Sequence, residues 1–347
     1  MVVNTTETQA RRPARAGSAP ASSAQAASAQ AASAQRSRPG LPVAGPEGAK
    51  PSRSSSAAEV LQAYLRQQVA VLRSLEPEVR ADAFDAVHQM RVATRRLRAA
   101  LRTFGQVIPR SRTEKVAAEL GWLGTVLGEA RDDEVLSTHL LASLEPTPVE
   151  LLIGPVRARV QGHYAPRRAA AHAALVEALG SLRYATLLVD LDRLVHEPPP
   201  GPLAAAPASV VLPPAVYRAY RQARRRMRPA RYAPSGQARD VALHRARKSA
   251  RRARYAAEAA SPVIGKRARR FARQMKKVQT VLGDHQDAVL ARQAARDLGI
   301  AAYLAGENAF TYGLLHEDEL HRAEQLQARA RRVWRRASRP RYRRWMQ

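Results

Sequence analysis

The sequence contains no cysteine among its 347 residues, few aromatic residues and half as many acidic as basic side chains. The lack of cysteine excludes disulfides, thiolate metal sites, iron–sulfur clusters and a cysteine nucleophile. Aromatic residues make up 5% of the chain, so platforms for stacking nucleic-acid bases are sparse. No run of 18 or more apolar residues occurs, which argues against a transmembrane helix. The polar, arginine-containing N-terminus also lacks a signal-peptide core, so we expect a cytoplasmic protein.

Positive charge is the feature that the sequence has in excess. The chain carries 58 Lys and Arg against 29 Asp and Glu, a formal net charge of +29, and all but six of the basic residues are arginine. A compact fold with this surplus is destabilised by self-repulsion unless counter-charge lies nearby. The composition therefore predicts a polyanionic partner.

Hydrophobic periodicity divides the chain into two helical parts with flanking tails. Residues 1–56, with the repeat SAQAASAQAASAQ, contain few large apolar residues, and we expect a disordered basic tail. Apolar residues then recur at spacings of three and four, which predicts helices over 57–72, 84–104, 112–127, 133–143, 149–162 and 166–195. Residues 196–214 are rich in proline and are expected to form a linker without regular helix. The pattern resumes and predicts helices over 215–227, 237–260, 266–282, 286–297 and 302–335. The remaining residues, 336–347, read as a frayed basic tail, and the predicted fold class is all-α.

An internal duplication relates the two helical parts, 57–195 and 215–335. VHQMRVATRRLRAALRTF from Val87 aligns with LHRARKSARRARYAAEAA from Leu243, which matches His88 with His244. Downstream, LGEARD from Leu127 aligns with LGDHQD from Leu282 in nearly the same register. Because both motifs recur at nearly the same sequence offset, they predict two copies of one antiparallel helical bundle.

The duplicated helix presents a basic stripe beside its core face. With His88 at zero, Arg91, Arg95, Arg98 and Arg102 fall at about 280–340° at 100° per residue. The expected core residues, at about 160–260°, are Val87, Met90, Thr94, Leu97, Leu101 and Phe104. The stripe spans about 21 Å at the helical rise, which suits a linear polymer of phosphates better than one small anion. Arginine forks bind phosphate oxygens in bidentate fashion.

The second copy repeats this arrangement with His244, Arg247, Arg251 and Arg254. Its expected core face is small, which predicts a close helix–helix approach: Val241, Ala246, Ala250, Ala253, Ala257 and Ala260. Glu258 stands where the first copy has Arg102 and is expected to pair with Arg254 one turn earlier.

The paired H-x-x-R-x-x-x-R-R-x-R helices, each followed by L-G-x-x-x-D, resemble the CHAD family, the conserved histidine α-helical domain. The resemblance covers residues 57–335 and implies two similar bundles related by an approximate two-fold. It further implies binding of inorganic polyphosphate on a basic surface between the bundles, and association with polyphosphate granules. Carried over by position, it points to His88, Arg91, Arg95, Arg98, His244, Arg247, Lys248, Arg251 and Arg254. Charge and neighbourhood extend this set to Arg102, Lys266, Arg269, Arg270, Arg273, Lys276 and Lys277.

Two other functions compete with non-enzymatic polyphosphate binding. A basic helical surface also predicts nucleic-acid binding, although aromatic residues for stacking are few. A phosphatase or polyphosphate hydrolase needs carboxylates to hold a divalent metal, and the stripes contain almost none. The Asp-containing turns at 131–133 and 284–287 read as helix capping or arginine pairing rather than a metal site. We therefore expect no enzyme activity, no metal and no cofactor.

Overall fold

The fold of the described residues is entirely helical. The computed structural model describes residues 51–347 except residue 53, so nearly all of the predicted disordered tail lies outside the described residues. Within that part no β-strand forms, and the isolated bridge between Ser56 and Pro207 is the one β-type pairing there. The predicted all-α fold class is confirmed.

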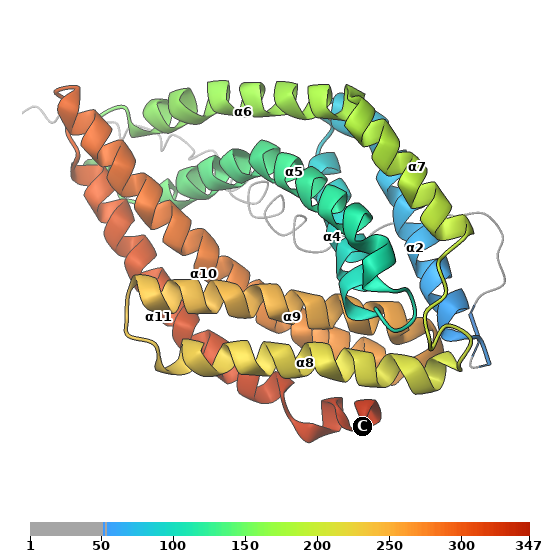
Figure 1. Ribbon diagram of the computed structural model, residues 1–347. Coiled ribbons are helices and arrows are strands. Elements are labelled where there is room, and N and C mark those ends of the chain that lie inside the picture. The colour runs from blue at the N-terminus through green and yellow to red at the C-terminus, as the bar shows by residue number, and fades with distance from the viewer. Residues whose placement is uncertain (1–50, 53) are drawn as a thin grey trace, which may run out of the picture. The chain divides into compact units, whose positions relative to one another are not determined.

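The helices of the first part of the chain are α2 (Ala57–Ser74), α3 (Glu76–Arg80), α4 (Ala86–Thr103), α5 (Arg110–Leu144), α6 (Val156–Gly180) and α7 (Leu182–His196), with the 3₁₀ turn η1 (Val149–Leu151) before α6. The helices of the second part are α8 (Ala208–Tyr232), α9 (Gln237–Ile264), α10 (Lys266–Leu304) and α11 (Phe310–Ala337), followed by the 3₁₀ turns η2 (Pro340–Tyr342) and η3 (Arg344–Met346). Figure 1 shows their order along the chain.

Local chemistry explains where several helices begin and end. Ser56 caps α2 and forms a capping box with Glu59, because each side chain accepts from the other residue's backbone N–H. Ser181 accepts from the Tyr184 N–H and begins α7, which divides the helix predicted over 166–195. Gly265 separates α9 from α10 at a positive φ of 70°, a conformation that glycine adopts without steric strain.

Several predicted helices are joined in pairs into one continuous helix each, and α6 runs unbroken from the segment 149–162 into the segment 166–195. The segments 112–127 and 133–143 join in α5, and the segments 266–282 and 286–297 join in α10. The interpretation of the two Asp-containing turns as helix caps is therefore wrong. A glycine inside a helix weakens it by only about 1 kcal/mol, which tertiary packing readily offsets.

The proline-rich segment also differs from its prediction. Helix α8 begins at Ala208 and includes Pro213 and Pro214, so residues 208–214 are helical. Val211, Leu212 and Val216 are buried around these prolines, and their burial stabilises the helix despite two missing backbone donors.

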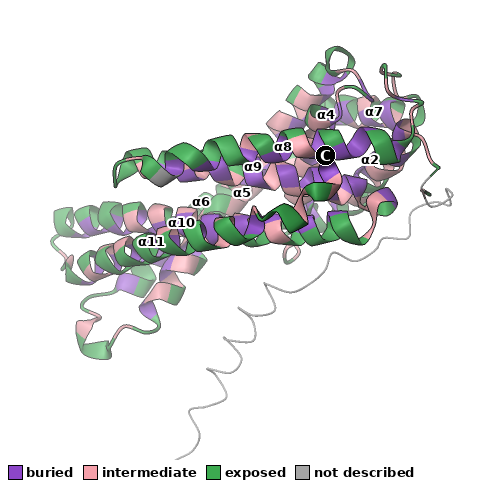
Figure 2. Cartoon of the chain, turned by 90° about the horizontal axis from the view of Figure 1, so that it is seen from below, coloured by how far each residue is buried: buried purple, intermediate pink, exposed green. Residues whose placement is uncertain are grey.

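Buried residues form one large hydrophobic core and one smaller cluster. The larger core draws on α2, α4, α5, α7, α8, α9 and α10, and the smaller cluster joins Leu140 and Val160 to Ala295 and Leu315. Figure 2 shows buried positions recurring along the helices between exposed ones, as expected for amphipathic helices. Helix α4 packs against α5 and α9, and α9 packs against α8 and α10. The two helices with the His/Arg motif are therefore in direct contact.

Candidate anion-binding site

Helix α4 buries the face that its periodicity predicts. Val87, Met90, Thr94, Leu97, Leu101 and Phe104 are all buried. Arg91, Arg95 and Arg98 are half-buried beside this face, whereas His88 and Arg102 are exposed. The basic stripe therefore borders the core and is supported by it.

Helix α5 provides a flat surface on which two of these arginines lie. A Cβ atom built on Gly128 would lie 3.0 Å from Nη2 of Arg91, and one built on Gly121 would lie 3.0 Å from Cζ of Arg98. One turn after Gly128, Asp132 accepts a hydrogen bond of 2.8 Å from Nη1 of Arg91. The L-G-x-x-x-D motif thus seats the first arginine of the His/Arg helix, and the predicted arginine pairing is confirmed at Asp132.

Helix α9 buries the predicted alanine face with one exception. Ala246, Ala250, Ala253, Ala257 and Ala260 are each 0% exposed. Val241 is 42% exposed, so its assignment to the core is wrong. It lies in the second turn of α9, where Leu243 occupies the buried position.

The basic stripes of α4 and α9 form two basic rows, and polar side chains of α10 hold the row on α9 in place. Nδ1 of His244 lies 2.6 Å from Oε1 of Gln286, and Nη1 of Arg254 donates to Gln279 over 3.2 Å. Arg254 also pairs with Glu258 at 2.6 Å, which confirms that prediction. Asp287 lies near Arg247, whose charge lowers the pKa of its carboxyl, but burial has the larger effect and raises that pKa.

Glu258 further links the two basic rows. Its Oε2 lies 3.4 Å from Nη2 of Arg96 on α4, while its Oε1 accepts from Arg254 on α9. Both guanidinium groups lie over the ring of buried Tyr255, at 5.7 Å for Arg96 and 5.4 Å for Arg254. The carboxylate of Glu258 thus offsets the charge of two arginines, and its contacts hold α4 against α9.

Arg95 of the first row and Arg247 and Arg251 of the second row have no carboxylate partner of this kind. Burial, with the neighbouring charge of Arg95 as the next cause, lowers the pKa of Arg251 to about 10. Burial likewise lowers the pKa of Arg95, and the charges of Arg91 and Arg247 add to this effect. Within residues 51–52 and 54–347, Arg95, Arg247 and Arg251 form no ion pair, and Nε of Arg95 is buried without a hydrogen-bond partner. Three guanidinium groups from α4 and α9 therefore act on one another without an ion-pair partner among the described residues.

The positive region extends beyond the residues predicted from the sequence. Burial lowers the pKa of Arg252 on α9, and the charges of Arg102, Arg110 and Arg98 lower it further. Desolvation by surrounding protein atoms lowers the pKa of His88 even though the residue keeps exposed surface. Asp85 raises this pKa, and the charges of Arg95 and Arg131 lower it. The predicted site residues do not include Arg110, Arg131 and Arg252, because a helical wheel of one helix does not show which residues of neighbouring helices face it.

The predicted basic residues of α10 lie on its surface. All six are exposed: Lys266, Arg269, Arg270, Arg273, Lys276 and Lys277. Arg270 lines a separate cavity together with Arg267 and the C-terminal segment. Lys248 on α9 is also exposed, and its charge acts on the adjacent His244.

The described residues contain no group of three or more His, Asp or Glu side chains placed to hold a metal ion. In that same part of the chain, no helix is long and apolar enough to cross a membrane.

The architecture and the site define a class: all-α proteins in which two arginine-rich helices meet at a cationic surface. The model of the CHAD domain matches residues 63–296, and the chain belongs to the CHAD domain family. It is 38% identical over 291 residues to two uncharacterized proteins of Mycobacterium tuberculosis, from strains CDC 1551 / Oshkosh and ATCC 25618 / H37Rv. This match covers 82% of the chain and 55% of each relative, so the chain spans about half of their length.

Two solved structures share the fold. The CHAD domain from the plant Ricinus communis is 25% identical, has a TM-score of 0.59, and the match covers 81% of this chain and 93% of that one. PptA from Streptomyces chartreusis is 23% identical, has a TM-score of 0.67, and the match covers 81% of this chain and 100% of that one. At this level of identity, the likeness to PptA establishes the fold alone.

Proposed function

We propose that the protein binds inorganic polyphosphate, without catalysis, at the surface formed by α4 and α9, and that it associates with polyphosphate granules. The observation that carries this proposal is the convergence of Arg95, Arg247 and Arg251 without an ion-pair partner. A polyanion placed between the rows would relieve this repulsion at several positions at once. Membership of the CHAD family supports the same ligand.

The shape of the charged region favours a thin, regularly charged chain. His88 and Arg102 lie at opposite ends of α4, about 21 Å apart at the helical rise. Both rows border buried side chains rather than a broad exposed face. Successive phosphates of a linear polymer can contact both rows, and the release of counterions makes such binding strongly dependent on salt.

Binding without catalysis fits the residues around the arginines. Two carboxylates near the rows are engaged in ion pairs, Asp132 with Arg91 and Glu258 with Arg254 and Arg96. A third, Asp287, lies near Arg247, whose charge acts on it. Metal-assisted phosphate hydrolysis requires carboxylates free to hold the ion. The pairing of Asp132 and Glu258 with arginines supports binding of phosphate without hydrolysis, and metal-dependent phosphate release that is lost on substitution of Asp132 or Asp287 would contradict it.

A competition titration tests polyphosphate against nucleic acid as the ligand. Long-chain polyphosphate and single-stranded RNA or duplex DNA are titrated against labelled complexes of the full chain at matched phosphate and salt concentrations. We expect polyphosphate to displace both nucleic acids, and an excess of nucleic acid to leave bound polyphosphate in place. The opposite ranking would identify nucleic acid as the ligand.

Polyphosphate affinity is expected to rise as pH falls from about 8 towards 6, the range in which histidine titrates. Desolvation by neighbouring protein atoms lowers the pKa of His88 and His244 in the free protein, whereas bound phosphate raises it. Affinity should increase as pH falls through the bound-state pKa and level off below the free-state pKa. Isothermal titration at a series of pH values measures this dependence. The His88→Gln/His244→Gln variant should flatten the profile, and an unchanged profile would remove both histidines from the site.

A further inference from the structure

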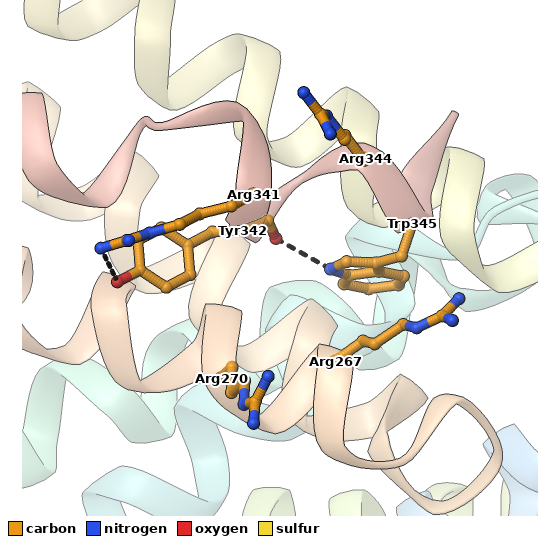
Figure 3. A pocket seen from close by; sticks show the side chains of 6 residues that line it. All are labelled: Arg267, Arg270, Arg341, Tyr342, Arg344 and Trp345. Atoms are coloured by element: carbon orange, nitrogen blue, oxygen red, sulfur yellow. Dashed lines mark hydrogen bonds between the residues drawn. The ribbon is translucent and has the colours of Figure 1, made fainter.

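A second arginine cluster lies where the C-terminal segment packs on α10. A cavity of about 380 Å³ is lined by Arg267, Arg270, Arg341, Tyr342, Arg344 and Trp345. Figure 3 shows Arg267 and Arg270 on α10 and the other four side chains on the C-terminal segment. The predicted frayed tail is therefore a docked segment that completes a cavity.

Buried apolar contacts hold this segment in position. Met346 is 1% exposed, and Trp345 and Tyr342 pack against the larger core. The rings of Trp345 and Phe271 meet edge to face with centroids 6.4 Å apart. Gln347 donates to the Tyr217 hydroxyl on α8 over 3.2 Å. The cavity wall is thus anchored at several points, as a preformed binding site requires.

The cavity combines four positive charges with no lining carboxylate. Within the described residues, Arg267, Arg270, Arg341 and Arg344 make no ion pair, and the first turn of α10 contains no acidic residue. The guanidinium of Arg341 lies 4.9 Å from the Tyr342 ring centre and donates to its hydroxyl over 3.0 Å. Hydrogen bonding from Arg341 lowers the pKa of Tyr342. The cavity therefore favours an anionic ligand.

The aromatic residues narrow the class of anion. The indole Nε1 of Trp345 already donates to the Tyr342 carbonyl over 2.9 Å, so its polar atom is used and its ring offers stacking surface. A chain of phosphates gains nothing from such a ring, whereas a nucleobase stacks on aromatic rings and guanidinium planes while its phosphates bind arginine forks. A volume of about 380 Å³ lies within the range for small-molecule sites, about 300–1,000 Å³.

We infer that this cavity is a nucleotide site, which takes a nucleoside diphosphate or triphosphate with its base against Trp345 and its phosphates on Arg267, Arg270 and Arg344. The site is separate from the surface formed by α4 and α9, because its residues lie at the start of α10 and in η2 and η3. The inference does not depend on polyphosphate being the ligand of that surface.

Calorimetric titration of the full chain tests the inference with ATP, adenosine and inorganic triphosphate as probes. In the Arg267→Gln/Arg344→Gln variant, the affinity for ATP should fall by about 100-fold, because two charge-assisted contacts are lost. The Arg168→Gln/Arg329→Gln variant is the matched control, since it removes the same charge from exposed positions on α6 and α11, and it should leave ATP affinity within about twofold. Equal losses of affinity in the two double variants would overturn the inference.

The contribution of the ring is tested separately. Trp345→Leu should weaken ATP binding by about tenfold, the size of one lost stacking contact, and should leave the binding of triphosphate unchanged. Circular dichroism and the melting temperature verify that the C-terminal segment remains docked, and Trp345→Phe, which retains an aromatic ring, should recover most of the affinity. An unchanged affinity for ATP in the Trp345→Leu variant would overturn the assignment to a nucleotide.

Discussion

Replacement of both Arg95 and Arg251 by glutamine is expected to weaken polyphosphate binding by about 10² to 10⁴. Each guanidinium supplies charge-assisted hydrogen bonds to phosphate, worth about 1.5–3 kcal/mol apiece, and every 1.4 kcal/mol corresponds to a tenfold change in affinity. The two residues come from different helices but share one electrostatic environment. Glutamine keeps a shorter, neutral polar side chain and introduces no new ion pair with Arg91 or Arg247. Titration calorimetry with long-chain polyphosphate at fixed salt measures the loss.

The matched control removes the same charge elsewhere. Arg168 on α6 and Arg329 on α11 are exposed, and within the described residues neither forms an ion pair. The Arg168→Gln/Arg329→Gln variant should change the affinity by less than about threefold, because exposed charges far from the ligand are screened by salt. Equal losses in the two double variants would mean that the net charge of the chain, and not the α4–α9 surface, attracts the polymer.

Substitution of Arg251 by methionine is expected to stabilise the free protein while weakening its ligand binding. The pKa of Arg251 is lowered to about 10 by burial and by the charge of Arg95. A base with a lowered pKa destabilises the folded state at every pH below that value, so the effect is fully present at neutral pH. Methionine keeps the apolar stem and removes the charge. We expect a gain of about 1 kcal/mol, within the range of charge-relieving substitutions, and a melting temperature higher by about 2–4 °C.

Thermal unfolding with and without polyphosphate measures both parts of this prediction. The ligand should raise the melting temperature of the native protein, and this rise should shrink in the Arg251→Met variant. Arg96→Met is the control, because Arg96 pairs with Glu258 across the helix interface. Its removal should lower the melting temperature. A lower melting temperature in the Arg251→Met variant would contradict this prediction, because it would show that the charge of Arg251 stabilises the free protein.

The sequence predicts the features that depend on one helix at a time. The core face of α4, the alanine face of α9 and the pairing of Glu258 with Arg254 all follow from the spacing of residues along a single helix, and the structure confirms them. Val241 is the exception, since Leu243, which aligns with Val87 of the first copy, takes the buried position in that turn of α9. The approximate two-fold remains a prediction from the duplicated motifs.

Features that depend on how helices cross are not accessible from such spacing. The seat that Gly128 and Asp132 provide for Arg91 requires α5 to run unbroken beneath α4, whereas glycine followed by aspartate also matches the pattern of a helix end. Arg252 joins Arg98 and Arg102 only because α9 lies against α4. Arg270 faces the C-terminal cavity because the chain beyond α11 returns to the start of α10. The spacing of residues within a helix does not predict where this C-terminal segment packs.

The structure of the protein in complex with a polyphosphate of defined length tests the central claim most directly. If the two basic rows act as one site, phosphoryl oxygens will lie within about 3.2 Å of guanidinium nitrogens from Arg95 on α4 and from Arg247 or Arg251 on α9 in the same bound chain. Bound phosphate confined to one of these helices, or found only on the exposed basic residues of α10, would contradict it.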